Sequence, residues 1–98
     1  MEKLNSEKIL GKLTKEKKKL KNKGVKKIGL FGSYARDEQK KESDIDFLIE
    51  MKKIDFDNYL YVLHLLEKMF RRKVDLVIEK DLKPELKYVL NEAKYVKI

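Results

Sequence analysis

The sequence predicts a small α+β domain in which helices pack on one small mixed β-sheet. Short runs with apolar residues at every second position alternate along the chain with longer runs of helical spacing. The chain has 98 residues, of which 42% are hydrophobic, and no Gly/Pro-rich linker separates the runs. We therefore expect residues 1–98 to form a single domain with the element order αβαβαβα.

The first predicted element is a helix over residues 5–23. Asn5 or Ser6 can cap its start, and Gly24 is placed to end it. Lysines occupy its outer face, and its apolar residues recur at helical spacing: Ile9, Leu10, Leu13 and Leu20.

Period-two alternation predicts strands over residues 25–31, 44–51 and 73–79, and residues 95–98 fit a short edge strand. Between the strands we expect a short helix over residues 34–39, a long helix from a cap at Asp55 to Arg72, and a last helix from Pro84 through Asn91.

The long helix is apolar nearly all round its axis, which is typical of a helix buried on more than one side. A homodimer or another partner that packs on residues 56–72 would explain this. His64 lies on this helix without a second His or Cys to complete a zinc site, so we expect a surface role for it. The residues expected on the core face are Phe56, Leu60, Leu63, Leu66 and Phe70.

The net charge of +8 is confined to residues 1–27, which hold eleven Lys and three Glu (11 − 3 = +8). A solvated lysine face is the favoured interpretation, and a nucleic-acid-binding arm is the alternative. The chain lacks Cys and a long apolar run, which excludes disulfides and predicts neither signal peptide nor membrane span. We expect a cytoplasmic protein.

Two carboxylates, Asp44 and Asp46, are spaced for one face of a strand. Such neighbours repel by roughly 2–3 kcal/mol at an effective dielectric constant near 20, and a shared divalent cation would compensate. Asp75 lies in a strand that is otherwise apolar, where an acid is costly unless it is paired or metal-bound. If the two strands are neighbours, three carboxylates can converge. The alternatives are a solvated strand face and, for Asp75, a salt bridge to Arg71 or Arg72.

A possible phosphate site precedes these acids. Gly32 and Ser33 end a strand and open a helix, where free backbone N–H groups favour an anion. Arg36 could reach the same phosphates or pair with an acid, and Ser43 could orient the loop before Asp44. An ordinary strand-to-helix turn is the alternative.

Together these residues resemble the minimal nucleotidyltransferase branch of the DNA polymerase beta-like nucleotidyltransferase superfamily. The resemblance rests on Gly32-Ser33, then Asp44-x-Asp46 after ten residues, then Asp75, and it covers most of the chain. It implies the nucleotidyltransferase fold, with Gly32 and Ser33 on the triphosphate of ATP. The three Asp side chains would bind two Mg²⁺ ions, and Asp75 would also help deprotonate the acceptor hydroxyl.

Members of this branch commonly act as antitoxins of helical HEPN-domain toxins, and some transfer AMP to a tyrosine of the toxin. The resemblance therefore implies a protein adenylyltransferase with a HEPN partner. Three alternatives stay open: a binding module that neutralises a partner by covering it, a nucleic-acid-binding protein, and transfer to a small molecule. The lysine-rich segment lacks aromatic residues for base stacking, so we do not expect nucleic acid as the partner.

Overall fold

A four-stranded mixed sheet forms the centre of the protein, and the computed structural model describes residues 3–98. The strand order is β3-β2-β1-β4, with β1 antiparallel to both of its neighbours and β2 parallel to β3. The predicted α+β class with a mixed sheet is confirmed, and all four predicted strands are present: β1 (Val25–Phe31), β2 (Ile45–Met51), β3 (Val74–Ile78) and β4 (Lys94–Lys97).

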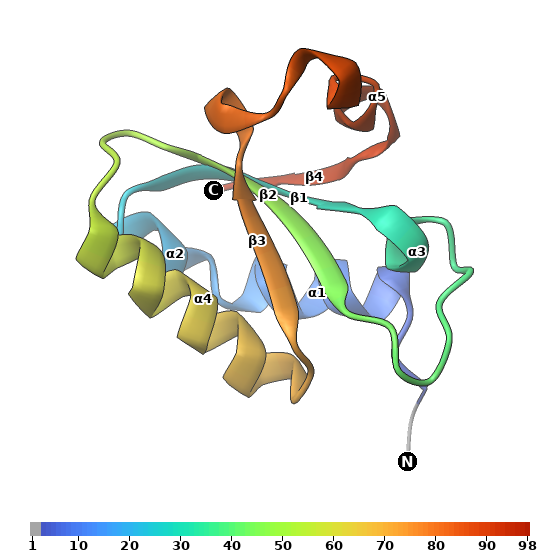
Figure 1. Cartoon of the computed structure of the whole chain (residues 1–98). Coiled ribbons are helices and arrows are strands. Elements are labelled where there is room, and N and C mark those ends of the chain that lie inside the picture. Colours follow the sequence, from blue (N-terminus) through green and yellow to red (C-terminus); the bar gives the residue numbers. More distant parts are fainter. Residues whose placement is uncertain (1–2) are drawn as a thin grey trace.

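The helices divide between the two faces of the sheet (Figure 1). The longer ones lie on one face: α1 (Ser6–Lys15), α2 (Lys17–Asn22) and α4 (Phe56–Phe70). Short turns lie across the other: η1 (Glu79–Asp81), η2 (Pro84–Leu86) and α5 (Val89–Glu92). The single turn α3 (Gly32–Ala35) follows β1 directly. None of the helices in residues 3–98 combines the length and apolar character that a membrane span requires.

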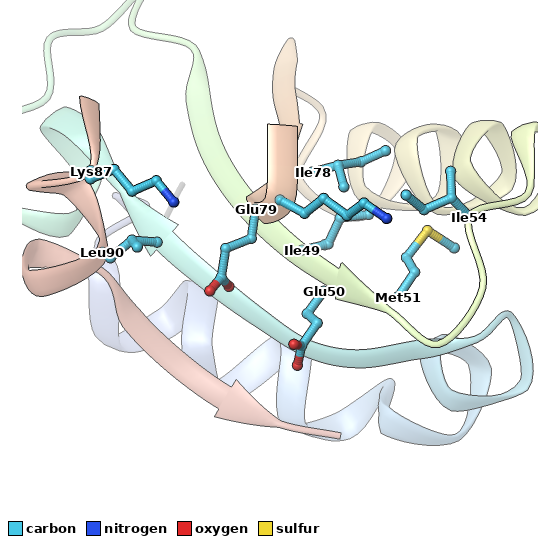
Figure 2. A pocket seen from close by; sticks show the side chains of 9 residues that line it. Ile49, Glu50, Met51, Ile54, Ile78, Glu79, Lys87 and Leu90 are labelled. Atoms are coloured by element: carbon cyan, nitrogen blue, oxygen red, sulfur yellow. The ribbon is translucent and has the colours of Figure 1, made fainter. Parts of the chain in front are cut away.

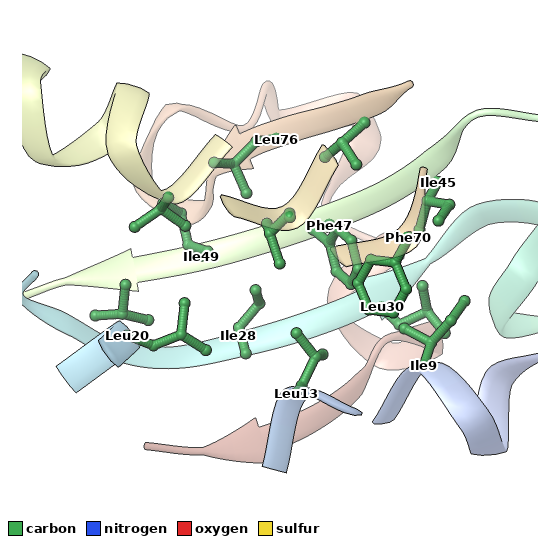
Figure 3. Packing of buried hydrophobic residues seen from close by; sticks show 14 of the residues in the cluster. Ile9, Leu13, Leu20, Ile28, Leu30, Ile45, Phe47, Ile49, Phe70 and Leu76 are labelled. Carbon is green, nitrogen blue, oxygen red and sulfur yellow. The ribbon is translucent and has the colours of Figure 1, made fainter. Parts of the chain in front are cut away.

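The main hydrophobic core lies between the sheet and the longer helices (Figure 3). Ile28 and Leu30 of β1 meet Ile45, Phe47 and Ile49 of β2 there, as strand alternation predicts. The opposite face carries only a small buried cluster around Leu48, Leu82 and Val89. Because this face is thinly covered, polar side chains on it can stay in contact with solvent.

Three of the helix predictions are corrected. The first helix has its predicted cap, since the Asn5 side chain accepts a hydrogen bond from the Lys8 N–H, but it is interrupted at Glu16. The short helix begins at Gly32 rather than Tyr34 and ends before Asp37, whose φ of 54° is left-handed. The last helix divides into η2 and α5, because only Val89 of α5 is buried and no side chain caps either turn.

The core face of α4 also differs from the prediction. Val62, Leu66 and Phe70 are its buried residues, spaced four apart, whereas Phe56 is 71% exposed and Leu60 is half-buried. Phe56 is the first residue of α4 and so lies at the end of the helix. The cap at Asp55 and the exposed position of His64 are as predicted.

Candidate active site

The pairing of β2 with β3 places Asp46 beside Asp75. The two residues are register partners in the parallel ladder, so their side chains leave the same face of the sheet. Asp44 lies one residue before β2, whereas the sequence predicted it on the strand, and it is close enough for its charge to act on Asp46. The sequence prediction that Asp46 and Asp75 come from neighbouring strands, on one side of the sheet, agrees with this geometry.

The face that carries the acids is the thinly covered one. Ile45 and Phe47 flank Asp46 in sequence and point into the main core, so Asp46 points the other way. Asp46 is half-buried, whereas Asp44 and Asp75 are exposed. The site is thus open to solvent on its outer side, as a site for a charged ligand must be.

The electrostatic state of Asp46 reflects its neighbours. Its partial burial, with the charges of Asp75 and Asp44, raises the pKa of Asp46 from 3.8 to about 6, and Arg36 opposes this. The charges of Asp44 and Asp75 therefore disfavour the ionised form of Asp46. A group with a raised pKa in an open site is a candidate for function rather than for stability.

Gly32 lies against Asp46 and could not be another residue without a shift of the chain. Its φ is +73°, which other residues rarely adopt. A Cβ atom at Gly32 would lie 2.2 Å from Oδ2 of Asp46. The glycine therefore brings the start of α3, with its unpaired N–H groups, against the carboxylate.

The loop after α3 is fixed by side chains from distant segments. Asp37 accepts hydrogen bonds of 3.0 Å from both the N–H and the hydroxyl of Ser6, and these bonds lower the pKa of Asp37. The Ser43 hydroxyl accepts a bond of 2.8 Å from the Lys40 N–H. Ser43 thus shapes the loop before Asp44, as the sequence suggested, and Asp37 is a positioning residue that sequence reasoning missed.

Arg36 is ion-paired rather than free to reach a phosphate. Its Nε is 2.8 Å from Oε1 of Glu38, and its Nη1 is 3.6 Å from Oε2 of Glu92. Of the two roles that the sequence suggested for Arg36, the structure shows the pairing. A nucleotide contact would need the exposed guanidinium to exchange these partners.

An open hollow of about 390 Å³ adjoins Asp75 and Arg36. Its apolar wall includes Phe31 and Val77 of the sheet, and its rim carries Tyr88, which is 59% exposed. Sequence reasoning missed Tyr88, because it fell in a predicted helix and nothing in the local pattern connects it to Asp75. The hollow has the size and mixed polarity of a site for a small ligand.

Comparison with known proteins shows to which family the chain belongs. The family profile described as Nucleotidyltransferase domain matches residues 10–96, from α1 through the acids to β4. The chain belongs to the nucleotidyltransferase domain family. A protein adenylyltransferase, MntA, of Thermococcus cleftensis is 40% identical over 96 residues, which are 95% of this chain and 97% of that protein. A candidate protein adenylyltransferase of Methanocaldococcus jannaschii, MJ1379, is 49% identical over 71% of this chain and 74% of its own length.

Solved structures share the fold. A structure described as a minimal nucleotidyltransferase superposes with a TM-score of 0.81 at 26% identity and covers 96% of this chain and 98% of that one. A toxin–antitoxin structure with AMP-PNP gives a TM-score of 0.68 at 26% identity, over 84% of this chain and 69% of that chain. The nucleotidyltransferase fold that the sequence resemblance implied is therefore confirmed.

The residue types of this site suit a divalent cation. Mg²⁺ prefers a few carboxylates together with phosphate oxygens and water, and Asp46 and Asp75 offer two carboxylates on one face, with Asp44 next to β2. As their side chains stand, no three His, Cys, Asp or Glu residues within 3–98 converge as closely as metal ligands do.

A second hollow, of about 220 Å³, lies at the other end of β2 and β3 (Figure 2). It also contains two acids, Glu50 and Glu79, whose side chains extend from these two strands toward the same region. Here a cation is already present, since Lys27 Nζ is 3.6 Å from Oε2 of Glu79. The charge of Glu79 is therefore partly balanced within the protein.

Proposed function

We propose that this chain is an ATP- and Mg²⁺-dependent protein adenylyltransferase that acts as the antitoxin of a HEPN-family toxin. The observation that carries the proposal is the register of Asp46 with Asp75 beside Gly32, which places carboxylates against a turn with free N–H groups. Relatives named as protein adenylyltransferases, matched over most of this chain, support the reaction class.

Each part of the site has a role in this reaction. The N–H groups and hydroxyl of Gly32-Ser33 hold the triphosphate, and the base and ribose occupy the hollow beside Arg36 and Asp75. An acceptor hydroxyl attacks the α-phosphorus in line, and the bond to the β-phosphate breaks to release pyrophosphate. Asp44, Asp46 and Asp75 would hold Mg²⁺, which stabilises charge on the attacking and leaving oxygens. Asp75, as the exposed acid of the hollow, accepts the proton of the acceptor.

The acceptor is best supplied by a partner protein. The toxin–antitoxin structure that matches this fold contains AMP-PNP, which supports an ATP-like substrate for this chain. A further structure of the same fold holds a tri-AMPylated HEPN toxin of Shewanella oneidensis in complex with its MNT antitoxin, which supports a HEPN partner. The hollow beside Asp75 is open, and exposed Leu86 and Tyr88 at its rim can contact a protein surface. We place this activity in the cytoplasm, where ATP is available.

A homodimer is a separate part of the proposal. The exposed Phe56 of α4 could contact a second copy of the chain, and analytical sedimentation tests whether that dimer forms.

The test uses Asp44→Asn with Asp46→Asn, assayed separately for AMP transfer from labelled ATP and for neutralisation of the toxin. Both should be lost, since removal of two carboxylates eliminates the metal site. A matched control is Glu50→Gln with Glu79→Gln, which removes the same charge from the same strands. If neutralisation survives undiminished in the Asp variant, the protein acts as a covering module and catalysis is not its function.

A further inference from the structure

We propose that a basic groove along α1 and the loop before β2 binds the phosphodiester backbone of a double-stranded nucleic acid. The basic groove is defined by Lys3, Lys12, Lys15, Lys40, Lys41 and Arg72. The proposal goes beyond the transferase reaction and does not depend on it, because none of these side chains belongs to the site described above, where Lys40 takes part only through its backbone N–H.

The basic groove consists of two adjoining hollows that share Lys3 and Leu4. The first, of about 280 Å³, runs along α1 past Gly11 to Lys15. The second, of about 580 Å³, continues between the start of the chain and the loop after α3, and reaches Arg72. Residues far apart in sequence thus form one continuous positive surface, which the sequence showed only as a lysine-rich helix.

Most of the cations that define the groove form no ion pair with the residues that the structure describes. Within residues 3–98 the ion pairs use Lys19, Lys27 and Arg36, and none of them includes Lys12, Lys15, Lys40, Lys41 or Arg72. Asp37 is the one acid that lines the groove, and Ser6 holds its carboxylate. A polyanion would therefore find several cations in a row.

Gly11 is a second, independent observation. Glycine weakens a helix interior relative to alanine, yet nothing in the described structure lies within 4 Å of a Cβ atom built at Gly11. Packing therefore does not require the glycine. Its effect is to leave space on the groove floor, one residue from Lys12, so that no side chain at this position obstructs a ligand that contacts the lysines.

The composition of the groove favours a duplex over a single strand or a protein. A protein partner or an unpaired base needs exposed aromatic or apolar anchors. The large exposed apolar side chains lie elsewhere, and Tyr34, the aromatic residue of the groove, is only 2% exposed. Lysine contacts to phosphates need no such anchors, and a duplex carries one charge per 1.7 Å of its axis.

The test measures binding of labelled RNA and DNA duplexes of about 20 base pairs by fluorescence anisotropy across a salt series. The groove variants are Lys12→Glu with Lys15→Glu and, in an exposed loop where folding is not at risk, Lys40→Glu with Lys41→Glu. The matched control is Lys52→Glu with Lys53→Glu, an exposed pair outside the groove with the same change in charge. Thermal melts check that each variant is folded.

We expect each groove pair to weaken binding about tenfold or more and to reduce the salt slope by about two, since each lost phosphate contact lowers it by about 0.9. The control pair should change the affinity less than about threefold, through net charge alone. Equal losses in groove and control variants would overturn the proposal. So would absence of saturable binding at about 100 mM salt, tighter binding of a single strand of the same sequence, or equal competition by polyglutamate.

Discussion

Strands β2 and β3 carry one acidic pair near each end: Asp46 beside Asp75, and Glu50 near Glu79. Glu50 and Glu79 directly follow the last register pair, Ile49 with Ile78, and Glu79 is the first residue of η1, so the two acidic pairs lie near opposite ends of the same β2–β3 ladder. They differ in what surrounds them. Lys27 lies 3.6 Å from Glu79 and over the ring of Tyr95, whereas within residues 3–98 no ion pair joins a cation to Asp44, Asp46 or Asp75.

The two ends show two ways in which a fold can accommodate neighbouring carboxylates. At the Glu end the protein supplies its own cation. At the Asp end the repulsion persists, the pKa of Asp46 is raised to about 6, and a glycine keeps the chain close to the carboxylate. Unbalanced charge beside a glycine turn indicates that a ligand, rather than a lysine, completes the site.

The largest expected difference between the two ends is in catalysis. Asp75→Asn should lower the rate of AMP transfer by about 10²-fold or more, because in the proposed reaction Asp75 is both a metal ligand and the proton acceptor. Glu79→Gln, four residues further along, should leave the rate within about threefold. Single-turnover transfer from labelled ATP measures both. Equal losses in the two variants would remove the distinction between the ends.

The next effect concerns Gly32. Gly32→Ala should cost about 2–3 kcal/mol of unfolding free energy and most of the activity, because alanine there has an unfavourable φ and meets Asp46. Gly24→Ala is the matched control, since Gly24 also has a positive φ but open space around it. It should cost about 1 kcal/mol without loss of activity. Chemical denaturation measures the stability of each variant, and an activity assay measures its transfer rate. If Gly32→Ala and Gly24→Ala changed both properties equally, contact with Asp46 would be unimportant.

A smaller effect is expected from pH. Because the pKa of Asp46 is higher in the folded than in the unfolded chain, the folded state binds more protons between pH 3.8 and about 6. Protonation of Asp46 should therefore add stability as the pH falls from 7 towards 5. The shift corresponds to about 3 kcal/mol, which solvent screening of this half-exposed group reduces to about 1 kcal/mol.

Asp46→Asn supplies the control for that experiment. The variant should be more stable than the parent at pH 7 and should lose the gain on acidification, as measured by urea denaturation in magnesium-free buffer. The bonds that lower the pKa of Asp37 act in the opposite sense, and their stabilisation is lost as the pH falls through the acid range below 3.8. A parent protein that loses stability steadily from pH 7 to 5 would contradict the raised pKa of Asp46.

The smallest effect is expected at the Glu end. Lys27→Met should lower the unfolding free energy by about 1 kcal/mol or less, through loss of the ion pair with Glu79 and the contact with Tyr95. It should not change AMP transfer. Lys26→Met, at the exposed neighbouring position, is the control and should change neither property. A loss of transfer in the Lys27 variant would show that the Glu end contributes to the reaction.

The Asp end could be predicted from sequence, because strand alternation has a fixed period, whereas the Glu end was not predicted. The pattern around Phe47 and Leu76 was enough to place Asp46 and Asp75 on strands, and their common face followed once the strands were neighbours. The turn at Gly32 was also predictable from the end of the β1 pattern. Such local rules fix which side chains share a face.

The rest depends on contacts between distant segments, which no local pattern encodes. The pairing of Arg36 with Glu92 joins residues 56 positions apart, and the Asp37–Ser6 bonds join residues 31 positions apart. The predicted core face of α4 was right for Leu66 and Phe70 and wrong for Phe56, because an apolar helix offers several faces and only the docked sheet selects one of them. The hollow beside Tyr88 depends on how η2 and α5 lie over the sheet.

The most direct test of the difference between the two ends is paramagnetic broadening of the backbone amide signals by Mn²⁺ with a non-hydrolysable ATP analogue. The central claim predicts that the signals of Gly32, Asp44, Asp46 and Asp75 broaden first, while those near Glu50 and Glu79 persist at the same Mn²⁺ concentration. Broadening that begins at the Glu end, or equally at both, would contradict it.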